Sequence, residues 1–243
     1  MPRRSVTDLV SLHEIMWRVR PDLIVELGTD CGGSAHFFAR TALGYAPHAK
    51  VITFDVVSQA RRESACLQAH AHRQRLSRRG INAAYARADW KHVPAAAIAS
   101  QSWADLVHAG SLINVTGKWW LADSQRLLAR AAAAAERVMV IDDASHKAKD
   151  VLHVFDTLSP LVTIGSYYLV QDTRLDVECA VAILRLPDPS PLCRALLLHG
   201  GPATAVAKLS VQKSFQRMWQ QDRTAELWGI TQHPGGYLRR VRR

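Results

Sequence analysis

Short apolar runs that end in or near an acidic residue alternate along this chain with helical segments. The apolar runs cover residues 23–28, 50–55, 82–89, 137–143 and 166–172. Strands that alternate with helices form βαβ units, so the pattern predicts an α/β fold with a mainly parallel central sheet and helices on both faces. Ligands of such open sheets bind beyond the carboxyl ends of the strands. The acidic residues therefore predict a binding site at that edge of the sheet.

The remaining segments complete the prediction of a single domain over residues 1–243. Residues 1–20 are expected to form a helical lead-in, and residues 100–120 an insertion that carries two adjacent tryptophans. The run CAVAILRL (179–186) is typical of a further strand. Residues 187–243 are expected to form a C-terminal helical segment, broken at Gly-Gly-Pro, and a closing strand.

Composition favours a soluble globular protein. Hydrophobic residues make up 48% of the chain and charged residues 21%, and no apolar run approaches the roughly 20 residues that span a bilayer. The four cysteines lie far apart without a C-x-x-C pair, which predicts neither a zinc site nor a disulfide framework. We therefore expect a cytoplasmic protein in a reducing compartment.

The net charge of +10 is concentrated in the segment 61–80 and in the C-terminal YLRRVRR. A basic helix and a basic tail can attract nucleic acid. No aromatic residues interleave with these arginines as a stacking platform for bases would require. A solvated basic face is the favoured interpretation, and nucleic-acid binding is kept as the alternative.

The stretch LIVELGTDCGGSAHFFAR (23–40) places a glycine-rich loop between a strand and a helix. It is neither the G-x-G-x-x-G of dinucleotide folds nor a phosphate loop ending in Gly-Lys-Ser/Thr. An acid before the first glycine suits a cation, and a free helix start suits a carboxylate. S-adenosylmethionine carries both groups. The predicted cofactor-binding residues of this loop are Glu26, Gly28, Thr29, Gly32, Gly33 and Ser34.

Two further acids extend this cofactor prediction. Asp55 ends the second run, where an acid can accept hydrogen bonds from both hydroxyls of a ribose. Asp89 ends the third run and could face the adenine. The alternative for each is a solvated or helix-capping carboxylate.

A second acidic group follows the fourth and fifth runs. Asp143 and His146 follow one, and Gln171 and Asp172 end the other. Carboxylate and amide oxygens are ligands that Mg²⁺ prefers, which predicts a metal site at Asp143, Gln171 and Asp172. His146 could act as a base, with Asp143 also catalytic through the metal. The alternative is that Asp143 or Ser145 caps the next helix.

Taken together, the segments VITFDV, VMVIDDASH and SYYLVQDT, with the glycine loop and the closing HPGGYLRR, resemble the cephalosporin hydroxylase/rhamnosyl O-methyltransferase family. The resemblance implies a Rossmann-like class I S-adenosylmethionine-dependent methyltransferase fold. It also implies Mg²⁺ at the acids, as in related macrolide-sugar O-methyltransferases, and a basic role for His146. One departure is Gln171, which stands where the family has glutamate and weakens the metal site by one charge.

The favoured function is therefore an O-methyltransferase that uses S-adenosylmethionine and methylates a hydroxyl of a sugar or natural-product small molecule. An RNA methyltransferase and a non-catalytic protein that retains the fold are the alternatives. A homo-oligomer is a further expectation about partners, and a membrane span is not expected.

Overall fold

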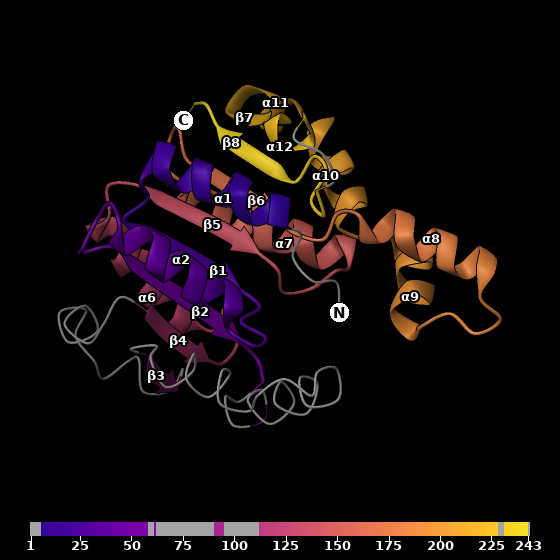
Figure 1. Ribbon diagram of the computed structural model, residues 1–243, viewed down its shortest axis with the longest axis horizontal. Helices are drawn as coiled ribbons and strands as arrows, with labels where there is room; N and C mark the ends of the chain where they lie inside the picture. The colour runs from indigo at the N-terminus through magenta and orange to yellow at the C-terminus, as the bar shows by residue number, and fades with distance from the viewer. Residues whose placement is uncertain (1–5, 58–60, 62–89, 95–111, 228–230, 243) are drawn as a thin grey trace. The chain divides into compact units, whose positions relative to one another are not determined.

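The computed structural model of the chain (Figure 1) describes residues 6–57, 61, 90–94, 112–227 and 231–242. The described chain forms two compact units. Unit 2 comprises residues 22–135, and unit 1 comprises residues 1–21 together with residues 136–243. The prediction of a single domain stays a prediction, and each unit is described by itself.

Three predictions fall on residues outside the described part of the chain. They are the strand 82–89, its terminal Asp89, and the basic segment 61–80 except for its first residue.

The described residues of unit 2 include four parallel strands in the order β3-β4-β2-β1. The elements are β1 (Leu23–Leu27), α2 (Gly33–Leu43), β2 (Lys50–Asp55), β3 (Trp90–Pro94), β4 (Leu112–Thr116) and α6 (Ala122–Ala134). Strand β1 is buried along its whole length, and the helices bury one apolar stripe each, including Phe38 of α2 and Leu127 of α6. Continuous burial is typical of a parallel strand covered on both faces.

Strand β4 lies within the range that the sequence predicted as an insertion. Its residues 112–116 pair with both β2 and β3, so this part of the range belongs to the sheet. The two tryptophans follow directly. Trp119 is 6% exposed and Trp120 is 49% exposed, which makes the first a core residue and leaves the second at the surface.

In unit 1, the part of the chain that the structure describes forms four strands in the order β5-β6-β8-β7. The pair β5–β6 is parallel, whereas β8 is antiparallel to both β6 and β7. The elements are α1 (Val6–Val19), β5 (Val138–Asp142), α7 (Ala148–Leu158), η2 (Ser159–Leu161), β6 (Tyr167–Val170), α8 (Leu175–Arg185), α9 (Pro191–His199), α10 (Pro202–Ser210), α11 (Lys213–Met218), β7 (Trp219–Gln221), α12 (Thr224–Leu227) and β8 (Tyr237–Arg240).

An aromatic cluster forms part of the core of unit 1. Phe155 of α7 makes an edge contact with Tyr168 of β6, with 5.0 Å between ring centroids. Phe215 and Trp219 close the cluster, the latter 5.3 Å from Phe155 between centroids. Edge and offset arrangements of this kind add about 1 kcal/mol per pair beyond the burial of their area. The cluster fixes α7 on the sheet beside β6.

The prediction of a strand over residues 179–186 is wrong, because residues 175–185 form helix α8. A short apolar run is compatible with a strand or with a helix, and periodicity alone does not separate them. The first turn of α8 carries Asp176 and Glu178, acids that favour a helix N-terminus. Both acids lie before residue 179, outside the apolar run itself.

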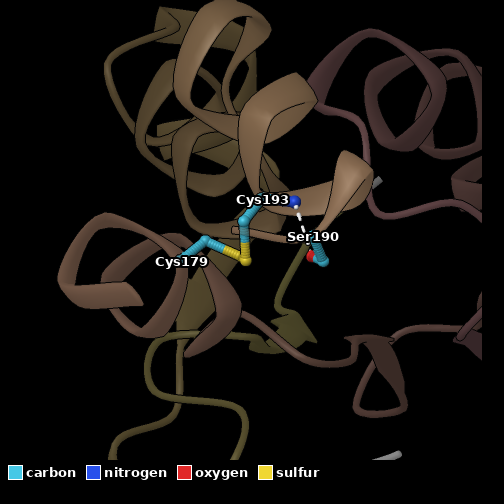
Figure 2. The surroundings of a disulfide bond; sticks show 3 residues. All are labelled: Cys179, Ser190 and Cys193. Carbon is cyan, nitrogen blue, oxygen red and sulfur yellow. Dashed lines mark hydrogen bonds between the residues drawn. A yellow bond between two sulfur atoms is a disulfide. The ribbon is translucent and has the colours of Figure 1, made fainter. Parts of the chain in front are cut away.

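The expectation that the cysteines form no disulfide is also wrong. Cys179 of α8 and Cys193 of α9 are bonded, with 4.7 Å between their Cα atoms (Figure 2). Cys31 is disulfide-bonded as well. The spacing of 14 residues between Cys179 and Cys193 carried no signal, because a helical hairpin brings the two together in space.

Helices α9 and α10 match the predicted helical segment with its Gly-Gly-Pro break, and β8 is the predicted closing strand. Among the helices of the described residues, none is both long and apolar enough to cross a membrane.

Candidate active site

The glycine loop of unit 2 has the backbone conformation that its glycines permit. Gly28 and Gly32 have φ angles of 91° and 74°, in the left-handed region where a Cβ is strained. Gly32 is the N-cap of α2, and Gly33 is the first residue of the helix. A Cβ at Gly33 would meet no described atom within 4 Å. The helix therefore begins beside open space, as a ligand-binding N-terminus requires.

Glu26 is buried at the end of β1 beneath this loop. Its side chain is 0% exposed, and Oε2 accepts a 2.7 Å hydrogen bond from the hydroxyl of Thr53 on β2. The Thr53 hydroxyl is also 2.7 Å from the hydroxyl of Thr29, itself buried in the loop. A buried carboxylate needs such donors. Glu26 and Thr29 are thus parts of one internal network.

Asp55 lies where β2 ends and shapes the same loop. Its two carboxylate oxygens accept hydrogen bonds from the backbone amides of Asp30 and Val57, at 2.9 and 2.8 Å. Asp30 itself has a positive φ of 43°. A carboxylate oxygen can accept more than one hydrogen bond. Asp55 can therefore hold the loop and still bind the hydroxyls of a ribose.

The acidic group of unit 1 is brought together as the sequence predicted. One ligand atom each of Asp143, His146 and Asp172 lies within 4.8 Å of the others. His146 Nε2 is 3.9 Å from Asp172 Oδ2, and these side chains are 26% and 17% exposed. Two carboxylates and an imidazole at this spacing can bind one metal ion together, or take up a proton from a molecule bound beside them.

The parallel register of β5 and β6 explains this meeting. Asp142 is opposite Val170, and the amide of Gln171 continues the ladder with a 2.9 Å hydrogen bond to the carbonyl of Asp142. Asp143 and Asp172 therefore leave neighbouring strands at the same edge. Neither Asp143 nor Ser145 is the N-cap of α7, which is Lys147; Ser145 instead donates to Asp150.

Asp172 has the positive φ of 54°, and a histidine that sequence reasoning missed holds it there. The amide of Asp172 donates a 2.8 Å hydrogen bond to Nδ1 of His233, whose side chain is 1% exposed. The next residue, Thr173, donates its hydroxyl to the carbonyl of Pro234. The segment HPGG (233–236) is thus a support under the loop after β6.

The segment HPGG is itself fixed on both sides. A Cβ at Gly236 would lie 2.1 Å from the carbonyl oxygen of Val170, so only glycine fits there. The buried carboxylate of Asp8 on α1 accepts hydrogen bonds from the hydroxyl of Thr231 and the amide of Gln232. The only sequence signal for this support is a histidine next to Pro-Gly-Gly, which lies 61 residues along the chain from Asp172.

Asp142 and Gln171 differ from the three clustered side chains because they point into the protein. Asp142 is 3% exposed and Gln171 is 2% exposed. Burial raises the pKa of Asp142 to about 7, against the opposing hydrogen bonds from the amide of Ala144 and the hydroxyl of Tyr168. Gln171 as a metal ligand stays a prediction.

The strand order, the glycine loop and the acids at the strand ends define a Rossmann-like α/β protein with the class I methyltransferase fold. The model of the rhamnosyl O-methyltransferase/CmcI family matches residues 3–82 and 123–241, and the chain belongs to this family.

Among the relatives, the rhamnosyl O-methyltransferase of Mycobacterium leprae (strain TN) is 24% identical over 173 residues, which are 71% of this chain and 58% of that protein. The chain thus spans less than two thirds of that relative. A solved structure of CmcI with Mg and SAM has a TM-score of 0.51 at 16% identity, over 98% of this chain and 73% of the other. A structure of CmcI with SAH has a TM-score of 0.50 at 15% identity, over 98% and 79%. These structural likenesses confirm the fold.

Proposed function

We propose that the chain is an O-methyltransferase that uses S-adenosylmethionine and methylates a hydroxyl of a sugar or natural-product small molecule. The observation that carries the proposal is the cluster of Asp143, His146 and Asp172 at the strand ends of unit 1. Family membership supports the reaction class, since the family is named for rhamnosyl O-methyltransferases. The same membership does not favour the RNA methyltransferase alternative.

The residues of unit 2 fit the methyl donor. The N-terminus of α2 opens at Gly33, where free backbone amides suit a carboxylate. Glu26 places a buried carboxyl group beneath the loop, which suits the ammonium and sulfonium groups better than a phosphate. Asp55 supplies carboxylate oxygens for the ribose hydroxyls. A structure of CmcI was solved with Mg and SAM, which agrees with this choice of cofactor.

The donor set of unit 1 fits a divalent cation. Asp143 and Asp172 offer carboxylate oxygens, the ligands that Mg²⁺ prefers, within 4.8 Å of each other. When bound, such an ion lowers the pKa of a coordinated hydroxyl and orients it. With Gln171 in place of a glutamate and buried, we expect Asp143 and Asp172 to provide the charge that holds the ion.

His146 is proposed as the base. O-methylation replaces the hydroxyl proton of the acceptor by a methyl group, so that proton has to be taken up. The side chain of His146 is 26% exposed, so an acceptor can contact it, and histidine is the side chain that most often serves as a general base. Asp172, 3.9 Å away, would stabilise the imidazolium that forms.

Calorimetry of the purified chain with S-adenosylmethionine, with and without Mg²⁺, tests the proposal, followed by a methylation assay on a panel of hydroxylated sugars. Binding at micromolar concentration and Mg²⁺-stimulated turnover are expected. No binding at high micromolar concentration would overturn the cofactor assignment. Binding without turnover on any acceptor would instead favour the non-catalytic alternative.

The small-molecule acceptor and the cytoplasmic location are parts of this proposal, although the Cys179–Cys193 disulfide removes the argument for a reducing compartment that rested on the cysteines. Binding of nucleic acid and of sugars to the chain can be compared at several salt concentrations. If nucleic acid binds with a steep salt dependence and the sugars do not bind, nucleic acid replaces the small molecule as the proposed acceptor.

A further inference from the structure

Helices α8 and α9 form a hairpin that extends from the rest of unit 1 in Figure 1. The Cys179–Cys193 disulfide joins them, and the Ser190 hydroxyl caps α9 by accepting a 3.2 Å hydrogen bond from the amide of Cys193 (Figure 2). Asp176 ties the base of the hairpin to α10, because its carboxylate accepts hydrogen bonds from the amides of Gly201 and Ala203. The hairpin is therefore a fixed structure.

Several large apolar side chains of this hairpin are exposed. On α8, Val177, Val181 and Leu184 are 65%, 40% and 85% exposed. Their spacing of four and three residues places them on one face of the helix. On α9, Leu197 and Leu198 are 60% and 75% exposed. Side chains of this size that gather on one element mark an interaction surface rather than the scattered apolar exposure of an ordinary surface.

Charge indicates which partner this surface fits. Residues 174–199 contain three arginines and three acids, so the hairpin is neutral with histidine uncharged, although the chain carries +10. A basic face would be expected for nucleic acid or an acidic lipid surface. A neutral apolar face can instead meet an identical copy without repulsion between like charges.

The pattern on α8 is also complementary to itself. Glu178 lies three residues before Val181 and Arg185 lies four residues after it, both at the same side of the apolar stripe. Glu178 also forms an exposed ion pair with Arg174 of its own helix, at 3.1 Å, which contributes little and leaves its second oxygen for another cation. In an antiparallel pair of α8 helices with the two-fold axis near Val181, Glu178 of each copy would lie beside Arg185 of the other. The interface of a two-fold dimer requires such self-complementarity.

We propose that the α8–α9 hairpin is a dimerisation surface, on which two copies of this chain pack their α8 helices antiparallel through Val177, Val181 and Leu184. This proposal is independent of the proposed function. Helix α8 is about 16 Å long, so the contact is smaller than a standard interface of about 800 Å² per partner. A dimer that dissociates in the micromolar range is therefore expected.

Sedimentation velocity of the oxidised 243-residue chain from about 1 to 100 μM tests the proposal. We expect a monomer–dimer equilibrium that Leu184→Glu shifts at least tenfold toward monomer, because the substitution places two charges in an apolar contact. Leu227→Glu is the matched control: Leu227 is 86% exposed on α12 of the same unit, and its variant should dimerise as the wild type does.

A charge exchange tests the antiparallel arrangement. Glu178→Arg and Arg185→Glu should each weaken the dimer, because like charges then meet across the axis, and the double variant should restore it. A wild-type chain that stays monomeric at 100 μM would overturn the proposal, as would equal effects of Leu184→Glu and Leu227→Glu. Binding of the hairpin to neutral phospholipid vesicles by a monomeric chain would overturn it in favour of a lipid partner. A double variant that dimerises no better than the single ones would overturn the antiparallel register.

Discussion

The two groups of acids in this protein are supported in different ways. In unit 2, the side chains of Glu26 and Asp55 accept hydrogen bonds from a neighbouring hydroxyl and from loop amides, and so help to form the loop that they serve. In unit 1, much of the support comes through the backbone: the amide of Gln171 bonds to β5, and the amide of Asp172 bonds to His233. Substitution of an acid should therefore damage structure and cofactor binding in unit 2, but chemistry in unit 1.

The substitution Asp143→Asn is the strongest test of this contrast. It keeps the shape of the side chain but removes one of the two carboxylates that would hold a divalent cation. We expect turnover to fall by about 10³-fold, within the range that positioned catalytic groups contribute, while the Kd for S-adenosylmethionine stays within about twofold. Methylation kinetics and calorimetry measure the two quantities.

Asp156→Asn is the matched control, because Asp156 is an exposed acid on α7 of the same unit. It should leave both quantities unchanged. A loss of cofactor affinity in Asp143→Asn that equals its loss of turnover would contradict the contrast between the units.

The support by His233 predicts a smaller effect. His233→Leu removes the acceptor for the amide of Asp172, and we expect turnover and Mg²⁺ affinity to fall about 10- to 100-fold, as for other groups that orient metal ligands. His233→Asn can present an oxygen near the position of Nδ1 and should recover part of the loss. If both variants lose Mg²⁺ affinity equally, the hydrogen bond to Asp172 is not what matters.

The sequence predicted the parts of the molecule that local pattern determines. Strands β1, β2, β5 and β6 fall within the predicted runs, because buried parallel strands are short, continuous and apolar. The same pattern predicted that the acids after these strands lie together, since the carboxyl ends of parallel strands meet at one edge of the sheet. Asp143, His146 and Asp172 could be grouped without a structure for this reason alone.

What the sequence did not predict depends on contacts between distant segments. His233 acts on a residue 61 positions away, and Asp8 fixes Thr231 over 223 positions. No local periodicity encodes such pairs. The Cys179–Cys193 bond was missed together with α8, because a run interpreted as a strand places Cys179 in a sheet and away from α9.

Thr53→Val tests the support by side chains in unit 2. The substitution keeps the volume of the side chain but removes the hydroxyl that donates to Glu26 and contacts Thr29. The loss of one hydrogen bond to a buried carboxylate should lower the free energy of unfolding by about 1.5 kcal/mol. Cofactor affinity should fall by less than about tenfold, with turnover at saturating cofactor unchanged.

Chemical denaturation and calorimetry measure these effects. Thr157→Val is the control, because the Thr157 hydroxyl bonds only to the carbonyl of His153 within α7 of unit 1 among the hydrogen bonds resolved for it. A Thr53→Val chain with wild-type stability and affinity would show that the loop does not depend on this network.

The smallest expected effect is a loss of stability at acid pH in unit 1, where Asp222 lies among hydrogen-bond donors. Asp222 follows β7 of unit 1 and accepts hydrogen bonds from the hydroxyls of Thr224 and Tyr167, beside the cation of Arg18. Burial alone would raise the pKa of Asp222, but these partners lower it to about 2. A carboxyl with a pKa below its unfolded value of 3.8 binds fewer protons in the folded state. Its contribution to stability is therefore complete above about pH 4 and is lost as the pH falls toward 2.

Hydrogen exchange at pH 4 and below then reports on each unit separately. We expect the amides of β6 and β8 to lose protection as the pH falls toward 2, and Asp222→Asn to reduce this dependence because its side chain does not titrate. Asp123→Asn in unit 2 is the control, since the exposed pair of Asp123 with Arg126 should contribute little. If Asp222→Asn leaves the pH dependence of amide protection in β6 and β8 unchanged, the contact of Asp222 with Tyr167 does not stabilise unit 1. The strands that carry the acids of unit 1 would then be held by their backbone hydrogen bonds.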